Sequence, residues 1–196
     1  MTFAADTVIA ETRAWVDHAV IGLNLCPFAR AVQFKNQIRY AVSDATDPDA
    51  LLATVREELH LLAGAEPARV ETTLLIHPYV LASFLDFNDF LGEADAAVEE
   101  LGYAGVLQVA SFHPQYQFAG TAADDVTNAT NRSPYPTLHL LREESIDRAV
   151  AAFPEANAIY EHNIRTLQAL GPQGWAALQE QCRGDAENSN EQDRRG

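Results

Sequence analysis

Between Gln37 and Phe112, stretches typical of β-strands alternate with stretches of helical spacing, and this alternation limits the fold more than any other feature. Alternating apolar residues mark the strands, and apolar residues three and four positions apart mark the helices. Helical connections of this length favour parallel strands joined by right-handed crossovers. The pattern therefore predicts one sheet in which at least the second and third strands are parallel. The expected strands are 37–43, 70–76 and 105–112, and the expected helices are 47–64 and 84–101.

A fourth strand is expected at 137–141, and helical stretches broken at Pro154 and Gly171 follow it. The expected fold is α+β or α/β, with a single sheet of about four strands that is partly parallel, covered by helices and followed by a C-terminal helical segment. A ferredoxin-like antiparallel sheet is the alternative if the order of the strands differs. Residues 1–182 are expected to form one globular domain. Residues 183–196 contain no large apolar side chain and are predicted to form a disordered polar tail.

The chain is strongly acidic, with 28 acidic and 13 basic residues and a formal net charge of −15 at pH 7. Such a field repels duplex nucleic acid and anionic membrane surfaces, so both are excluded as main partners. We expect a cytoplasmic protein, because the sequence shows no secretory signal and no long apolar run, and its two cysteines fit neither a disulfide framework nor a zinc spacing. Lys35 is the single lysine, so arginines are the main cations for recognising planar anions.

Cys26 precedes Pro27 and a short predicted helix that runs toward Gln33. At the N-cap of that helix, the thiol would meet unpaired N–H groups and the positive end of the helix dipole, which favour the thiolate. Arg30, one turn further on, would add to this effect. The position predicts a nucleophile or a soft metal ligand. The alternative is a small buried residue in a helix turn, because free cysteine is among the most buried residue types.

Two of the expected strands end in the same dipeptide, His77-Pro78 and His113-Pro114. If these strands are parallel, both histidines lie at the carboxyl edge of the sheet, where open α/β sheets bind ligands. An imidazole at that edge can serve as base, acid or metal ligand. The alternative is that each histidine caps a carbonyl group at the end of its strand. His139 lies inside the expected fourth strand and faces either the site or a hydrogen-bonded core position.

The densest group of chemically active side chains lies in the long irregular stretch 114–136. Arg132 can clamp a carboxylate or a phosphate through two hydrogen bonds, and Asp124 or Asp125 can orient a histidine or bind a cation. The alternative is a large ordered loop that is held by its own hydrogen bonds. No phosphate-binding glycine motif is present. The residues expected to bind the substrate are Arg30, Tyr116, Asn131 and Tyr135.

Three blocks of the sequence carry a resemblance to a known family: 21–29 (IGLNLCPFA), 112–118 (FHPQYQF) and 131–142 (NRSPYPTLHLLR). They resemble the characteristic blocks of the bacterial family catalogued as domain of unknown function 1415. The resemblance covers most of the chain apart from the tail. It implies a complete bacterial protein of one domain, and it brings neither an established activity nor a catalytic assignment.

The first functional hypothesis is a small-molecule enzyme at the carboxyl edge of the sheet. In this hypothesis Cys26 is the nucleophile, His113 the acid or base and Asp124 its partner, while Arg132 holds an anionic group of the substrate. Acyl transfer, amidino transfer or hydrolysis would suit this set of side chains. The ligand is expected to be small and anionic.

Two other hypotheses use the same edge of the sheet. The second is a metal-binding protein or metal-dependent hydrolase, in which His77, His113 and Asp125 bind zinc or iron, with or without Cys26. The third is a module that binds a small ligand in the crevice without catalysis. The sequence carries no motif for a nucleotide cofactor.

Overall fold

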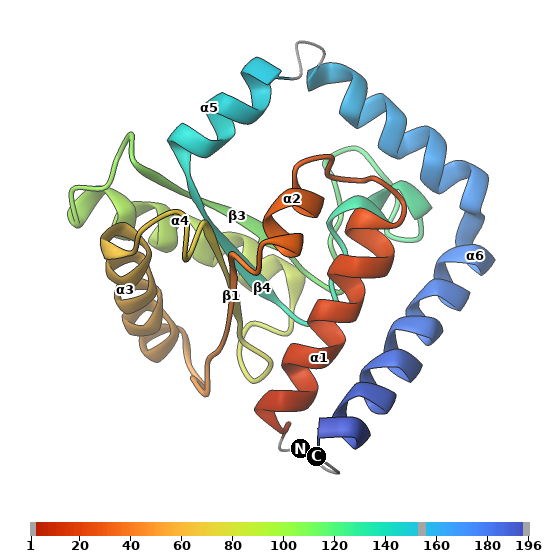
Figure 1. Cartoon of the computed structure of the whole chain (residues 1–196), viewed down its shortest axis with the longest axis horizontal. Helices are drawn as coiled ribbons and strands as arrows, with labels where there is room; N and C mark the ends of the chain where they lie inside the picture. The colour runs from red at the N-terminus through yellow and green to blue at the C-terminus, as the bar shows by residue number, and fades with distance from the viewer. Residues whose placement is uncertain (1–2, 153–155, 194–196) are drawn as a thin grey trace.

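The computed structural model describes residues 3–152 and 156–193. Within this part of the chain, four strands form one sheet, with helices on both of its faces (Figure 1). The strands are β1 (Ile38–Val42), β2 (Thr72–Ile76), β3 (Leu107–Phe112) and β4 (Thr137–Arg142). The α-helices are α1 (Ala5–Trp15), α2 (Ala29–Phe34), α3 (Pro48–Gly64), α4 (Phe84–Glu100), α5 (Glu143–Ala152) and α6 (Ala156–Asp193). A π-helical turn, η1 (Val16–Ile21), continues α1, and a 3-10 helix, η2 (Val126–Asn131), precedes β4.

The order of the strands in the sheet is β1-β2-β4-β3. β1 and β2 pair in parallel, whereas β4 is antiparallel to both of its neighbours, β2 and β3. The predicted single, partly parallel sheet is therefore confirmed, and the fully antiparallel alternative does not apply. β2 and β3 run in the same direction as predicted, but they do not pair, because β4 lies between them. The long connection from β3 to β4 lets the chain reverse and enter that position.

The two faces of the sheet are covered by different helices, as Figure 1 shows. α3 and α4 cover one face, where Leu75, Phe87 and Leu138 belong to one buried core. α1 covers the other face, with η1 continuing it and α6 packed against α1, and there Leu74 and Trp15 belong to a second core. Full burial of such side chains contributes about 1.5–3 kcal/mol each, so both layers stabilise the sheet.

Local sequence signals set the ends of the helices that connect the strands. Asp47 caps α3, and its side-chain Oδ1 accepts a hydrogen bond of 2.9 Å from the backbone N–H of Ala50. Pro48 follows at the first helical position, where its missing N–H costs nothing. Gly102, with a φ of 76°, ends the helical region of α4. These signals make the helices on the first face predictable from the sequence.

The C-terminal helix α6 packs against α1 and η2. Its backbone is kinked at Gly171, which has a φ of 69° and precedes Pro172, so the predicted break occurs there as a kink. For residues 183–193 the predicted disordered tail differs from the structure, in which α6 continues through Asp193, and residues 194–196 lie outside the described residues. Cys182 and Ala186 are buried, because their small side chains allow α6 to approach α1 closely without a large apolar anchor. In the described residues, none of the helices combines the length and hydropathy needed to cross a membrane.

Candidate functional site

His77 and His113 lie at the same edge of the sheet, as their positions after two strands of one direction predict. In the pairing register, Ile76 and Phe112 both stand opposite Thr137, the first residue of β4. The backbone N–H of His77 donates to the carbonyl of Pro136, and that of His113 donates to the carbonyl of Asn131. This edge is the carboxyl end of β1, β2 and β3.

The side chains of both histidines are fully buried under α4. The Phe87 ring lies between them, with centroids 5.6 Å from His77 and 5.1 Å from His113. Nδ1 of His77 donates to the carbonyl of Val80 at 3.2 Å, and Nε2 of His113 donates to the carbonyl of Leu81 at 3.2 Å. Burial lowers the pKa of His77 to about 4 and also lowers the pKa of His113. The two neutral imidazoles thus hold the loop before α4.

His113 has no nitrogen left for catalysis or for a metal. Its Nδ1 accepts a hydrogen bond of 3.0 Å from the backbone N–H of Gln115, and its Nε2 is the donor to Leu81. The second proposed metal ligand, Asp125, caps η2 by accepting hydrogen bonds from the backbone and the hydroxyl of Thr127. Among the described residues, no group of three or more histidine, cysteine, aspartate and glutamate side chains is placed to hold a metal ion.

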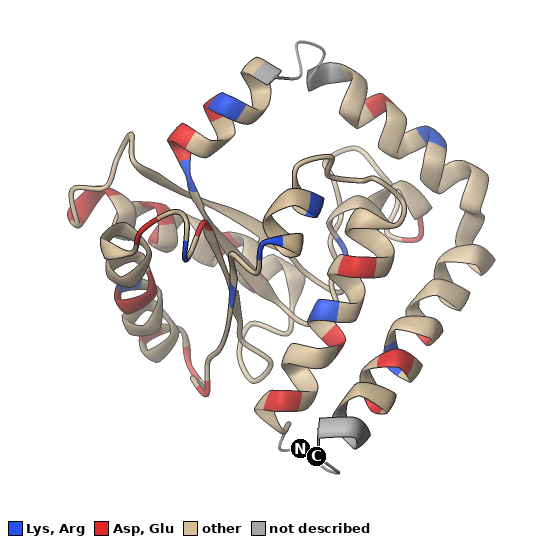
Figure 2. Ribbon diagram, viewed as in Figure 1, with Lys and Arg blue, Asp and Glu red and all other residues tan. Residues whose placement is uncertain are grey.

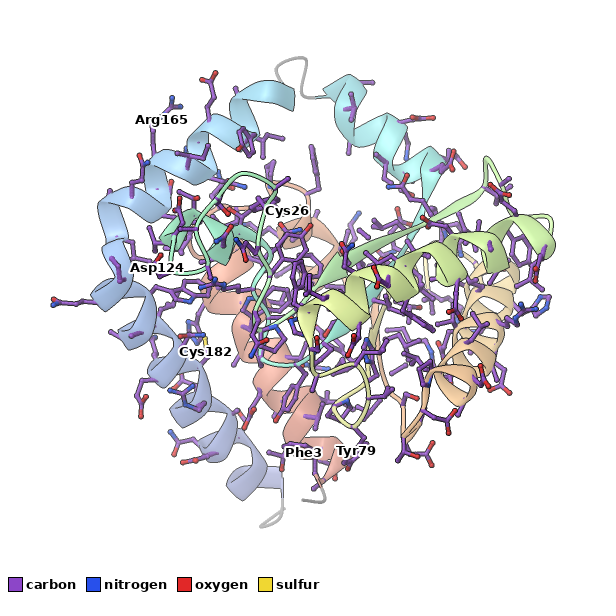
Figure 3. All side chains as sticks on the ribbon, turned by 180° about the vertical axis from the view of Figure 1, so that it is seen from behind. Phe3, Cys26, Tyr79, Asp124, Arg165 and Cys182 are labelled. Atoms are coloured by element: carbon purple, nitrogen blue, oxygen red, sulfur yellow. The ribbon has the colours of Figure 1, made fainter. Side chains whose placement is uncertain are left out.

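Cys26 does not occupy the predicted N-cap. α2 begins at Ala29 with Phe28 at the N-cap, because a turn closed by the hydrogen bond from Ala29 N to Cys26 O takes up the preceding residues. Leu25 packs in the core on the α1 and α6 face, whereas the side chain of His113 lies against α4 on the other face. The structure therefore does not bring Cys26 next to His113. Figure 3 shows Cys26 apart from Asp124 as well, and Arg30 and Asp124 are both exposed.

The loop that connects β3 to β4 is held by its own polar side chains, as one of the two sequence interpretations predicts. Asn128 is completely buried. Its Oδ1 accepts hydrogen bonds from the backbone N–H of Phe118 and the hydroxyl of Thr121, and its Nδ2 donates to the carbonyl of Ala122. Every hydrogen bond of this side chain stays inside the loop, so Asn128 is a structural residue.

Two of the predicted substrate-binding residues also hold the loop. The Tyr116 ring packs against Phe84 and Phe118, with centroid distances of 5.1 Å and 5.0 Å. The side chain of Asn131 donates from Nδ2 to the carbonyl of Ser111 at 3.3 Å. Both side chains therefore have structural partners within the protein.

Arg132 holds the loop but keeps unused donors. Its Nε donates to the carbonyl of Tyr116 at 3.2 Å, and its Nη2 donates to the carbonyl of Ala123 at 2.6 Å. A guanidinium has five N–H donors, so these bonds leave more than half of them free. Among the described residues, no carboxylate lies within ion-pairing distance of this group, although Asp125 attracts it from further away. Burial lowers the pKa of Arg132, yet an arginine stays charged at neutral pH.

Arg132 lines a cleft of about 220 Å³ at the carboxyl edge of the sheet. One wall is formed by the loop residues 132–135, which lead into β4. The opposite walls come from Glu11 and Trp15 of α1 and from Trp175 and Arg183 of α6. Figure 2 shows acidic residues spread over α1, α3, α4 and α6. The cleft differs from this acidic surface because two arginines line it.

The remaining polar groups of the cleft are partly engaged. The hydroxyl of Tyr135 donates to Oε2 of Glu11 at 2.7 Å, and burial together with this carboxylate raises the pKa of Tyr135. The guanidinium of Arg183 pairs with Glu180 on the same helix. Cys182 also lines the cleft, but burial raises the pKa of its thiol to about 11, so the thiol stays protonated at neutral pH.

Sequence reasoning found one wall of this cleft and missed the others. Arg132 and Tyr135 were predicted as site residues from the composition of their loop. Arg183 fell into the predicted tail, and Glu11 and Trp175 were not candidates for the site. No local motif links these residues, because they meet only when α1 and α6 pack together.

The chain is thus an α+β protein with a mixed sheet and an arginine-lined cleft at the carboxyl edge of its parallel strands. Residues 7–177 match the family model described as "Protein of unknown function (DUF1415)", and the chain belongs to this family. The resemblance carried by the three sequence blocks is therefore confirmed. No curated protein and no solved structure matches the chain.

Proposed function

We propose that this protein binds a small anionic molecule, carrying a carboxylate or a phosphate, in the cleft between Arg132 and α6. The observation that carries the proposal is the state of Arg132, which is fixed by two backbone carbonyls and has no carboxylate partner among the described residues. A guanidinium held in this way is preorganised for bidentate recognition of a planar anion. Arg183, which pairs with Glu180 on α6, lines the same cleft and offers further N–H donors.

Ligand binding explains the geometry better than thiol chemistry does. Leu25, the residue before Cys26, packs on the α1 and α6 face, whereas His113 lies against α4 on the other face, and Cys182 lines the cleft with a raised pKa. Arg132 and Tyr135 are the members of the sequence-predicted set that line the cleft. We place the protein in the cytoplasm, since both cysteines are free, and we take its ligand to be a small metabolite of that compartment.

The experiment measures binding of inorganic phosphate and acetate by calorimetry, and by the rise in melting temperature that a native-state ligand causes. Ionic strength is held constant, because salt screens exposed charges. Arg132→Lys keeps the charge but loses the planar fork, and we expect affinity to fall about tenfold or more. Arg183→Gln has no role in holding the loop and is expected to weaken binding to a smaller extent.

Arg165→Gln is the matched control, because Arg165 lies exposed on the same helix outside this cleft. It should bind like the wild type. The melting temperature of each variant without ligand shows whether the fold is intact. The proposal is overturned if the folded variants Arg132→Lys and Arg183→Gln bind the anions with the same affinity as the wild type. It is also overturned if the wild type binds neither phosphate nor acetate.

A further inference from the structure

Resting on the anion site proposed above, we infer that the ligand is zwitterionic, with a carboxylate for the arginines and an ammonium group for Glu11, as in an α-amino acid. The cleft contains charges of both signs that are not paired with each other. Glu11, Arg132 and Arg183 all line it, yet Glu11 forms no ion pair with either arginine in the described residues. A ligand that carries both charges would satisfy both sides of the cleft.

Glu11 is positioned to receive a cation. Its Oε2 accepts the hydroxyl of Tyr135 at 2.7 Å, which fixes the orientation of the carboxylate. The other carboxylate oxygen has no hydrogen-bond partner among the described residues. A hydroxyl donor leaves the negative charge of Glu11 in place, so an ammonium group that approaches the free oxygen gains a charge-assisted hydrogen bond.

The positive side of the cleft is formed by two arginines on separate elements. Arg132 projects from the loop before β4, where two carbonyls hold it. Arg183 projects from α6, where its Nη2 pairs with Glu180 and its other N–H groups remain as donors. Because a carboxylate has two oxygens, it can use the parallel N–H groups that a guanidinium offers. The two arginines therefore bind the acid end of the ligand, while Glu11 on α1 binds the amino end.

The rest of the cleft suits a compact apolar side chain. Trp15, Trp175 and Leu178 line it, and its volume of about 220 Å³ lies below the ~300–1,000 Å³ of pockets for drug-sized molecules. An indole face also attracts an ammonium ion through its π-electrons. These features favour an amino acid with an apolar or aromatic side chain over a larger anion.

The test compares three molecules that share one side chain: phenylalanine, 3-phenylpropionate and phenethylamine. Their affinities are measured by calorimetry at one pH and one ionic strength. We expect phenylalanine to bind at least about tenfold more tightly than 3-phenylpropionate, because one charge-assisted hydrogen bond is added. Phenethylamine is expected to bind weakest. The same series built on leucine shows whether the aromatic ring itself matters.

Glu11→Gln tests the role of the carboxylate, because glutamine can still accept the hydroxyl of Tyr135. This variant should lose the preference for phenylalanine over 3-phenylpropionate. It should bind 3-phenylpropionate at least as tightly as the wild type, because a negative charge beside the anion is removed. Glu161→Gln, an exposed position on α6, is the matched control and should keep the preference. The three affinities measured with the wild type test the zwitterionic ligand even if Glu11→Gln is unstable, because that comparison needs no variant.

The outcomes separate this inference from the proposed anion site. Binding of 3-phenylpropionate with an affinity equal to that of phenylalanine overturns the zwitterion and leaves the anion site standing. An unchanged preference in folded Glu11→Gln also overturns the assignment to Glu11. If none of the carboxylates binds and inorganic phosphate does not bind, the anion site itself is wrong.

Discussion

Mild acid should destabilise the fold through two imidazoles, that of the buried His77 and that of the half-buried His139. His77 lies under α4, and His139 lies on the other face of the sheet beside Phe112, with ring centroids 5.7 Å apart. Burial lowers the pKa of each from 6.5 to about 4. The neutral imidazole is therefore favoured by the folded state. Above pH 6.5 both states are neutral, and as the pH falls toward 4 the unfolded chain takes up protons that the folded chain does not.

The size of the effect follows from these pKa values. With 6.5 in the unfolded chain and about 4 in the fold, each histidine costs roughly 2 kcal/mol of stability between about pH 7 and about pH 5. The two together cost about 4 kcal/mol, a large part of the ~5–15 kcal/mol that stabilises a typical domain. Below the folded pKa, both states carry the proton and the loss levels off.

Urea unfolding followed by circular dichroism at the two pH values measures this loss. His139→Gln removes one titrating group, so its stability should fall with acid by about 2 kcal/mol less than that of the wild type. The same holds for His77→Gln. His162→Gln, on the exposed surface of α6, is the control for replacing a histidine as such. The reasoning fails if all four proteins lose the same free energy of unfolding between the two pH values.

Three further predictions follow from burial. Cys182 should react with iodoacetamide far more slowly than the half-buried Cys26, because burial raises the pKa of Cys182 to about 11; single-cysteine proteins followed by mass spectrometry check this, and equal rates would contradict it. Deletion of residues 184–196 removes the contact of the buried Ala186 of α6 with α1 and should lower the melting temperature by several degrees. An unchanged melting temperature would support the prediction that this segment is a disordered tail. Asn128→Ala leaves buried partners unpaired and should cost roughly 2–4 kcal/mol in urea unfolding, and a cost near zero would remove its structural role.

The sequence predicts the direction of each strand more accurately than it predicts which strands pair with each other. The helical crossovers between β1, β2 and β3 fix one direction for all three, so His77 and His113 were correctly expected at one edge of the sheet. The position of β4 depends on a long connection without regular periodicity, and no local signal shows that it enters between β2 and β3. Contacts of this kind are decided by tertiary packing, which a pattern of a few residues does not encode.

The helix over residues 183–193 and the cleft were not predicted, for a related reason. Large apolar residues are the usual sign of a packed segment, and 183–196 contains none. Helices that approach closely need small side chains instead, and Cys182 and Ala186 supply them on α6. Once α6 is placed against α1, Glu11 and Arg183 line the same cleft, although nothing in the sequence connects them.

The hydrogen bonds that each polar side chain already makes within the protein distinguish residues that can bind a ligand from residues that only hold the loop. A long loop without a strand ladder must satisfy its backbone N–H and carbonyl groups in other ways, so a high density of polar side chains is expected there for structure alone. His113 and Asn128 have their polar atoms engaged by the loop and the backbone around it. Arg132 is different, because it lines the cleft and makes two hydrogen bonds, while its other N–H donors have no partner among the described residues. Donor capacity that the protein leaves free, and not residue type, is therefore the argument for placing the ligand at Arg132.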